Sequence, residues 1–238
     1  MNQKYKLTDE TMIHDGIILH RIECVKAFGD VKIGDKGGWI ESENNLSQKG
    51  NAFVIGSAKV YGNAQISGNA RVSGHAEVCG NALVYGNAYV YENAKVYGNA
   101  EVYGAARVYG NAVVCDDAEV FDIGVVKGKA TVSGSVMVCG HVVIKDNANI
   151  CGCLQISGNA VICGDANVES IEDYMTFKNC WSSGRHFTWT RSNNMWKVGC
   201  FYGTGEELIK KAYEDSQQKG DCYKAVVDCV ENICKWIN

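Results

Sequence analysis

The chain has 238 residues, of which 46% are hydrophobic, and a formal net charge of −4 at pH 7. This length and composition suit a folded protein with a sizeable core. The weakly acidic balance argues against general binding to nucleic acid or to anionic membranes. Glycine is frequent, with 27 residues, and proline is absent. Because the glycines recur periodically, they indicate many repeated tight corners rather than a disordered linker.

Twelve cysteines would suit a secreted disulfide scaffold, but the sequence favours a reducing cytosol. The first residues are polar and charged and lack the pattern of a signal peptide. No stretch has the length and apolarity of a membrane span. Five cysteines fall at one position of a repeat, where other copies carry Tyr or Ser: Cys79, Cys115, Cys139, Cys151 and Cys163. We therefore expect a cytoplasmic protein.

Residues 1–45 are expected to form an entry segment that caps the next region of the chain. Strand-like pieces occupy residues 16–23 and 39–41, and a glycine-rich turn lies at residues 34–38.

Residues 46–169 contain a six-residue repeat. An aliphatic residue occupies every sixth position from Val54 to Val168, and a small residue, usually Ala, lies two positions before it. In a strand these two side chains point the same way and the residue between them points outward. Gly and Asn follow, as in Gly62 and Asn63, and turn a corner because both tolerate left-handed backbone conformations. This period predicts a solenoid.

The unit V-Y-G-N-A-x resembles the hexapeptide repeat of left-handed parallel β-helices. The resemblance implies that three hexapeptides form one triangular coil of 18 residues. The expected fold class is mainly β: a left-handed parallel β-helix, or hexapeptide-repeat solenoid, with a small C-terminal α+β domain.

A second resemblance covers shorter stretches. Residues 34–47, G-D-K-G-G-W-I-E-S-E-N-N-L-S, and the stretches 188–191 and 199–204 are similar to phage and prophage hexapeptide-repeat proteins of the polymer-forming or putative transferase type. The similarity implies a bacterial or phage cytosolic protein and implies no particular reaction.

With coils of 18 residues, the outward positions fall into three columns. One of them is apolar in its C-terminal half, where valines in adjacent coils are costly to expose. We predict that this column forms a homo-oligomer interface, and the resemblance favours a trimer. The alternative is that the C-terminal domain folds back over the column. The predicted interface residues are Tyr89, Arg107, Val125, Val143 and Val161.

Aromatic residues often follow the buried aliphatic position. We interpret them mainly as stacked β-stabilisers, with a binding surface for bases or sugars as the alternative. They are Tyr61, Tyr85, Tyr91, Tyr97, Tyr103, Tyr109 and Phe121.

Catalysis finds weaker support in the repeat. Hexapeptide-repeat acyltransferases need a histidine base, and His75 and His141 replace Asn at corner positions. Their separation is not a whole number of coils, so they fall at different corners and cannot share a site within one subunit. The sequence predicts no metal site and no cofactor.

Residues 170–238 are expected to form a small α+β domain. Alternating runs predict strands near residues 174–177, 185–191 and 195–200. Thr204 followed by Glu206 and Glu207 is typical of a helix start, with a helix to about Ser216 and a second helix over residues 221–237.

This domain holds the candidate ligand site. Hydroxyl groups and cations beside aromatic rings suit a phosphate or a nucleotide. The alternative is a hairpin turn beside a tryptophan-rich core. The candidate residues are Ser182, Ser183, Arg185, His186, Trp189, Arg191 and Lys197.

The sequence thus favours a non-enzymatic, oligomeric β-helix protein of phage or prophage origin. Its solenoid would serve as a rigid spacer and assembly platform, and its terminal domain would carry recognition. The phage context suggests inhibition of a host defence system through binding of a nucleotide signal or a defence protein. The alternatives are an acyltransferase that uses acyl-CoA at a subunit interface, with His75, His141 or His186 as base, and a structural filament-former.

Overall fold

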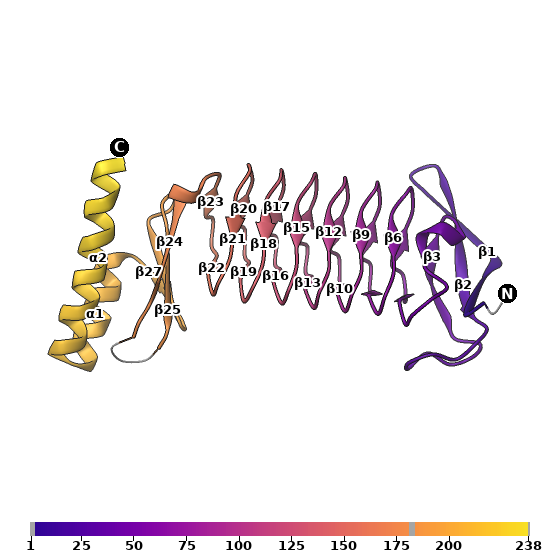
Figure 1. The fold of residues 1–238 in the computed structure, drawn as a ribbon, viewed down its shortest axis with the longest axis horizontal. Coiled ribbons are helices and arrows are strands. Elements are labelled where there is room, and N and C mark those ends of the chain that lie inside the picture. The colour runs from indigo at the N-terminus through magenta and orange to yellow at the C-terminus, as the bar shows by residue number, and fades with distance from the viewer. Residues whose placement is uncertain (1–2, 181–183, 238) are drawn as a thin grey trace.

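The computed structural model describes residues 3–180 and 184–237 and shows an elongated molecule (Figure 1). A parallel β-solenoid forms the middle. An antiparallel β-hairpin region lies at its N-terminal end, and a small sheet with two helices lies at its C-terminal end. The predicted fold class, a mainly β solenoid followed by a small α+β unit, is confirmed.

Each solenoid coil contains three strands of two residues. Strands one coil apart pair in parallel with a register of 18 residues, as Tyr89 pairs with Arg107 and Val90 with Val108. The register places the outward residues in the three predicted columns. The strands are β4 (Phe53–Val54), β5 (Lys59–Val60), β6 (Gln65–Ile66), β7 (Arg71–Val72), β8 (Glu77–Val78), β9 (Leu83–Val84), β10 (Tyr89–Val90), β11 (Lys95–Val96), β12 (Glu101–Val102), β13 (Arg107–Val108), β14 (Val113–Val114), β15 (Glu119–Val120), β16 (Val125–Val126), β17 (Thr131–Val132), β18 (Met137–Val138), β19 (Val143–Ile144), β20 (Asn149–Ile150), β21 (Gln155–Ile156), β22 (Val161–Ile162) and β23 (Asn167–Val168).

The three parallel sheets make three faces. The valine face is the sheet of β4, β7, β10, β13, β16, β19 and β22, which carries Val125, Val143 and Val161 outward. The glutamate face runs from β6 to β21 and carries Glu101 and Glu119 outward. The hairpin face runs from β5 to β23 and continues into the N-terminal strands.

The interior is filled by the aliphatic and small positions of the repeat. Ala58, Val60, Ala64 and Ile66 are fully buried, and the same holds for almost every later pair. Each buried valine stabilises the fold by roughly 1.5–3 kcal/mol. The narrow interior explains why the position before the central strand residue is alanine rather than a larger side chain.

At the corners, Gly and Asn have different tasks. Gly62 adopts the left-handed conformation, with φ of +67°, while Asn63 begins a ladder of side-chain hydrogen bonds. Its Nδ2 donates to Asn81 Oδ1 at 3.0 Å, and Asn81 Nδ2 donates to Asn99 Oδ1 at 2.9 Å. Glycine therefore supplies the turn, and asparagine ties successive coils together.

The N-terminal region contains β1 (Tyr5–His14), β2 (Ile17–Cys24), β3 (Lys36–Ile40) and the short 3-10 helix η1 (Glu43–Asn45). The three strands are antiparallel to one another, and β3 pairs in parallel with β5, where Ile40 lies opposite Val60. The strand β2 matches the expected strand near residues 16–23. Strand β1 was not anticipated, because its alternation of polar side chains lacks a clear apolar face.

The C-terminal region contains η2 (Ile171–Asp173), β24 (Tyr174–Lys178), β25 (His186–Thr190), β26 (Met195–Val198), β27 (Phe201–Gly203), α1 (Gly205–Asp215) and α2 (Gln217–Ile237). The four strands form an antiparallel sheet that lies across the end of the solenoid, with both helices on its outer side (Figure 1). The predicted cap of α1 is present, since Thr204 Oγ1 accepts a hydrogen bond from the Glu207 N–H at 3.3 Å. Helix α2 begins at Gln217, earlier than the expected residue 221.

Candidate interaction surfaces

The solenoid is closed at both ends by side chains of matching polarity. Along its length each outward N–H donates to a carbonyl in the next coil, as Val143 N does to Ala160 O at 2.9 Å. The first coil therefore presents carbonyls at its edge and the last coil presents N–H groups. An open edge of this kind would invite pairing with another chain.

At the N-terminal edge the closing groups are donors. Lys4 Nζ donates to the carbonyl of Ala52 at 2.7 Å, and the Tyr5 hydroxyl donates to the carbonyl of Leu46 at 2.6 Å. Lys4 is 4% exposed. Burial, together with the positive charge of Arg71, lowers the pKa of Lys4 to about 8.

At the C-terminal edge the closing groups are acceptors. Thr188 Oγ1 accepts from the N–H of Val161 at 3.0 Å, and Ser192 Oγ accepts from the N–H of Asn167 at 2.7 Å. Asp173 Oδ2 accepts from the N–H of Glu169 at 2.9 Å. The C-terminal sheet therefore ends the solenoid by replacing the coil that would come next.

The valine face is open along its C-terminal half. Val125, Val143 and Val161 point outward from adjacent strands and are half-buried. The C-terminal domain lies across the end of the solenoid rather than along this face (Figure 1). The alternative in which that domain folds back over the valines is therefore not what the structure shows.

The N-terminal part of the valine face is covered by the chain itself. Phe53 is buried against Phe28, with ring centroids 5.5 Å apart, and Arg71 forms an ion pair with Asp30. Beyond them Tyr89 is 46% exposed. A hollow of about 370 Å³ opens here, lined by Ser73, Tyr89, Tyr91 and Arg107.

Aromatic side chains stack along the solenoid corners. Tyr91 stacks on Tyr109 with centroids 4.7 Å apart, and Tyr85, Tyr103 and Phe121 form a second stack with centroids 4.8 and 5.0 Å apart. This spacing equals that of the coils. The rings therefore stabilise neighbouring coils, as the favoured interpretation of the sequence predicts.

Two hydroxyls of the second stack are engaged by the glutamate face. The Tyr85 hydroxyl donates to Glu101 at 2.9 Å, and the Tyr103 hydroxyl donates to Glu119 at 2.8 Å. Burial and the hydrogen bond to Glu101 raise the pKa of Tyr85 to about 12.

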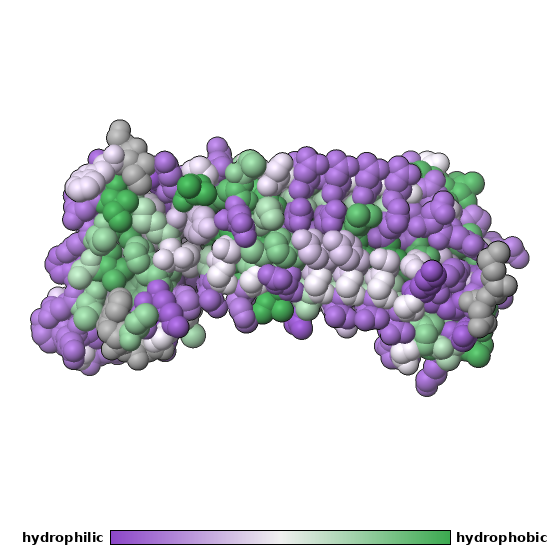
Figure 2. Space-filling view, viewed as in Figure 1, coloured by the Kyte–Doolittle hydropathy of each residue, from purple (hydrophilic) through white to green (hydrophobic). Residues whose placement is uncertain are grey.

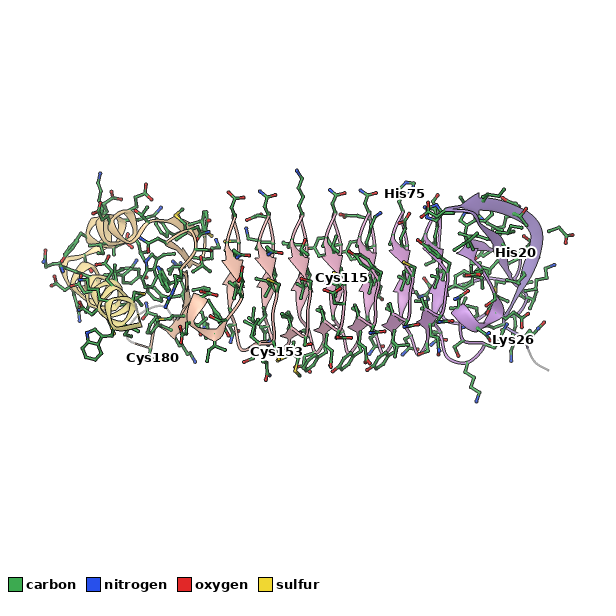
Figure 3. All side chains as sticks on the ribbon, turned by 90° about the horizontal axis from the view of Figure 1, so that it is seen from above. His20, Lys26, His75, Cys115, Cys153 and Cys180 are labelled. Atoms are coloured by element: carbon green, nitrogen blue, oxygen red, sulfur yellow. The ribbon has the colours of Figure 1, made fainter. Side chains whose placement is uncertain are left out.

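The two corner histidines lie far apart. His75 follows β7 at the corner between the valine and hairpin faces, and His141 follows β18 at the corner between the glutamate and valine faces. Both are exposed, and Figure 3 shows His75 projecting from its corner. The strands recur every six residues from β4 to β23, so no loop interrupts the coils.

The candidate ligand residues of the C-terminal domain are divided between the two sides of its sheet. Trp189 is 4% exposed in the core on the helix side, and its Nε1–H donates to Asn194 Oδ1 at 2.9 Å. Thr188 points to the solenoid, and because side chains alternate along a strand, His186 shares that side. Lys197, paired with Thr188, lies there too.

Two candidate arginines lie at opposite ends of β25. Arg185 lines a small hollow of about 70 Å³ together with Lys211 and Lys219. The Arg191 N–H donates to the Asp173 carbonyl at 2.8 Å, and its Nε and Nη2 are buried without a hydrogen-bond partner among the described residues. Ser182 and Ser183 lie outside the described residues. The structure thus does not gather the candidate set around one cavity.

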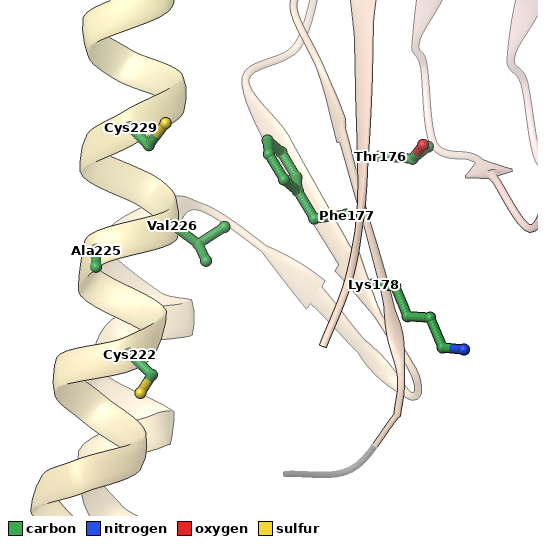
Figure 4. A pocket seen from close by; sticks show the side chains of 7 residues that line it. All are labelled: Thr176, Phe177, Lys178, Cys222, Ala225, Val226 and Cys229. Carbon is green, nitrogen blue, oxygen red and sulfur yellow. The ribbon is translucent and has the colours of Figure 1, made fainter. Parts of the chain in front are cut away.

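A larger hollow lies where the sequence pointed to no site. It has a volume of about 630 Å³ and opens between β24 and α2 (Figure 4). The one signal in the sequence was the helical spacing of Cys222, Val226 and Cys229, whose outward part has no obvious core partner. The lining residues are Thr176, Phe177, Lys178, Cys222, Ala225, Val226 and Cys229.

Within the part of the chain that the structure describes, no helix is long and apolar enough to cross a membrane. The same residues bring together no group of three or more His, Cys, Asp or Glu side chains that could hold a metal ion.

Comparison with known families finds a match to the YdcK beta solenoid repeat at residues 64–76. The matched stretch lies within the coils that contain β6 and β7. This similarity agrees with the repeat architecture and concerns only a short part of the solenoid. No curated protein matches the chain.

Proposed function

We propose that the chain is a non-enzymatic, homo-oligomeric scaffold and binding protein whose solenoid acts as a rigid spacer. One observation carries the proposal. A solenoid closed at both ends leaves one flat face open, and three adjacent valines lie on it. An architecture that closes its ends with dedicated side chains but leaves an apolar face uncovered is suited to lateral assembly and not to end-to-end filaments.

The valine face supports this assembly through its packing. Successive strands lie about 4.8 Å apart, so Val125, Val143 and Val161 form one continuous apolar strip. Leaving such a strip in water is unfavourable, and a second solenoid face covers it at little entropic cost because the backbone is already rigid. Three copies packed around an axis parallel to the solenoid are the stoichiometry that we propose for this contact.

The finer parts of the proposal come from the family resemblance. They are a solenoid of the left-handed hexapeptide-repeat type, a phage or prophage origin, a cytoplasmic location and a role in inhibiting host defence. A nucleotide signal or a defence protein is the partner class. The hollow beside Tyr89 and Arg107 supports nucleotide binding, because it offers a ring for stacking and a cation for phosphate.

The assembly is tested by placing a charge in the strip. We expect Val143→Glu to reduce the mass of the assembly in multi-angle light scattering, because a carboxylate cannot be buried there unpaired. Thr131→Glu is the matched control, since Thr131 is also half-buried and points outward, but from the hairpin face. A mass that stays the same in Val143→Glu would contradict the valine-face contact.

Native mass spectrometry of the protein purified from its host tests the binding role. Retention of a nucleotide supports the proposed ligand class. Retention of coenzyme A would overturn the proposal in favour of an acyltransferase with its site at a subunit boundary.

A further inference from the structure

Strand β24 is an edge strand with a free side. In the C-terminal sheet it pairs with β25, so that Met175 lies opposite Trp189 and Phe177 opposite Phe187. The Arg191 N–H donates to the Asp173 carbonyl and the Asn179 N–H donates to the Arg185 carbonyl, each at 2.8 Å. These bonds flank the strand and identify the residues whose backbone groups face β25.

Antiparallel pairing alternates hydrogen-bonded and non-hydrogen-bonded residues. Since Asp173 and Asn179 are bonded to β25, so are Met175 and Phe177. The backbone N–H and C=O groups of Tyr174, Thr176 and Lys178 therefore point to the outer edge. Among the described residues, no strand pairs with that edge.

The layer beside this edge is incompletely covered. Phe177 is half-buried, whereas Phe187 in the next strand is fully buried. The hollow between β24 and α2 continues the helix-facing layer outward past β24 (Figure 4). Figure 2 shows hydrophobic side chains gathered along α2. The sheet and the helix thus leave room for one more strand and its covering helix.

We infer that a second copy of the chain fills this place. Its β24 pairs antiparallel with β24 of the first copy about a two-fold axis at Thr176. In this register Thr176 meets its own counterpart, and Tyr174 lies opposite Lys178 of the partner subunit. All three outward-pointing residues then form hydrogen-bonded pairs, with two hydrogen bonds for each pair.

The charges of the strand are self-complementary in this arrangement. The acidic residues Glu169, Glu172 and Asp173 precede β24, and Lys178 ends it. Antiparallel pairing brings the basic end of one strand to the acidic end of the other, whereas parallel pairing would place like charges together. Cross-strand Thr–Thr and opposite-charge pairs both stabilise a sheet.

The helices are also suited to a two-fold contact. The side chains that α2 presents to the groove are small, namely Cys222, Ala225 and Cys229. Small side chains let two helices approach to about 8–10 Å. The two α2 helices would then extend the outer layer across the joined sheets and cover Phe177 of both copies.

This contact uses a different side of the molecule from the valine face. The Tyr174 hydroxyl donates to the carbonyl of Gln155 at 3.2 Å, so β24 lies at the end of the glutamate face. The sheet lies across the solenoid (Figure 1), so a two-fold axis normal to the sheet runs along the solenoid. The two solenoids would lie side by side with the same polarity.

The test combines two variants of this surface with one of the valine face. Ala225→Glu places two carboxylates near the two-fold axis on an exposed helix position, and Ala225→Ser is its matched control. Thr176→Pro removes an N–H that is not used inside the sheet, and Thr176→Val keeps that N–H. Circular dichroism and thermal unfolding establish that each variant is folded.

The masses are read by sedimentation or light scattering at equal concentration. We expect Val143→Glu to leave an assembly of two chains, twice the 25.9 kDa of one chain, and Val143→Glu combined with Ala225→Glu or Thr176→Pro to give single chains. We expect Ala225→Ser and Thr176→Val to keep the two-chain assembly in the Val143→Glu background. Thr131→Glu reports the effect of added charge alone.

Two outcomes would overturn the inference. One is a Val143→Glu protein that is already a single chain, and the other is a two-chain assembly that survives both Ala225→Glu and Thr176→Pro. Neither outcome bears on the valine face, which is tested by the change from wild type to Val143→Glu in the Ala225→Glu background.

Discussion

Thr188 Oγ1 accepts a hydrogen bond from the backbone N–H of Val161, at the position where a further coil would have placed a carbonyl. Thr188 is 2% exposed. One hydroxyl on an antiparallel strand thus completes the hydrogen bonding of a parallel sheet. The end of the solenoid is set by this replacement and not by a change in the core, because Ile162 and Val168 are as buried as the aliphatic residues of earlier coils.

Thr188→Val should destabilise the protein. The isosteric change removes the acceptor and leaves the Val161 N–H buried without a partner, at a cost of about 1–3 kcal/mol. Denaturant unfolding measures the loss. Thr131→Val is the control, because the backbone of β17 is paired on both sides. Equal losses in the two variants would show that the threonine shape matters and the hydrogen bond does not.

Lys4 should make the stability rise with pH. Its pKa is about 8 in the folded chain and near 10.5 in the unfolded chain. Between these values the unfolded state binds more protons, so the free energy of unfolding increases as the pH rises from about 8 toward 10.5. Below pH 8 both states are protonated and the contribution is constant.

Lys4→Met removes this dependence. The difference in free energy of unfolding between wild type and Lys4→Met, measured from pH 7 to 10, should increase in favour of wild type. The burial of Tyr5, which raises its pKa, acts equally on both proteins. A difference that stays flat over this range would show that Lys4 titrates normally.

Asp116 tests the corner geometry. It takes the left-handed conformation, with φ of +59°, where most coils have glycine, and its Oδ2 accepts from the N–H of Gly134 at 3.0 Å. We expect Asp116→Ala to lose about 1–2 kcal/mol, because alanine keeps the backbone strain and loses the hydrogen bond. Asp116→Gly should lose less, since glycine relieves the strain. Thermal unfolding of both variants checks this order, and the reverse order would exclude strain as the cause.

Tyr85 should ionise at unusually high pH. Burial and the hydrogen bond to Glu101 raise its pKa to about 12. Because the folded state keeps this proton while the unfolded state loses it, the stability falls as the pH rises above 10. Glu101→Gln removes the negative charge and should lower the pKa of Tyr85. Ultraviolet titration of Glu101→Gln, with Tyr85→Phe to identify the transition, measures the change.

The architecture of the solenoid could be predicted because it is local and repeated. The alternation of Ala and Val fixes which side chains enter the core, and the six-residue period fixes the number of strands for each coil. Lattice arithmetic alone also placed His75 and His141 at different corners, which the structure confirms. The placement of an aromatic after the aliphatic residue was enough to predict the stacks.

The candidate site was harder to predict because it depends on how separate segments meet. Arg185, Trp189 and Arg191 are close in sequence, yet an extended strand separates its ends and turns alternate side chains to opposite faces. The groove between β24 and α2 joins two segments that are distant along the chain. No local pattern shows that Phe177 and Val226 face the same hollow.

The sequence by itself determined the repeat, its core and its three outward columns, because each six-residue unit meets the same neighbours and short-range periodicity is sufficient. Only the tertiary structure decided where the repeat ends, which faces stay open and which strand is left at an edge. Those features depend on single contacts between distant segments, such as Lys4 with Ala52 and Thr188 with Val161. A contact that occurs once leaves no period in the sequence.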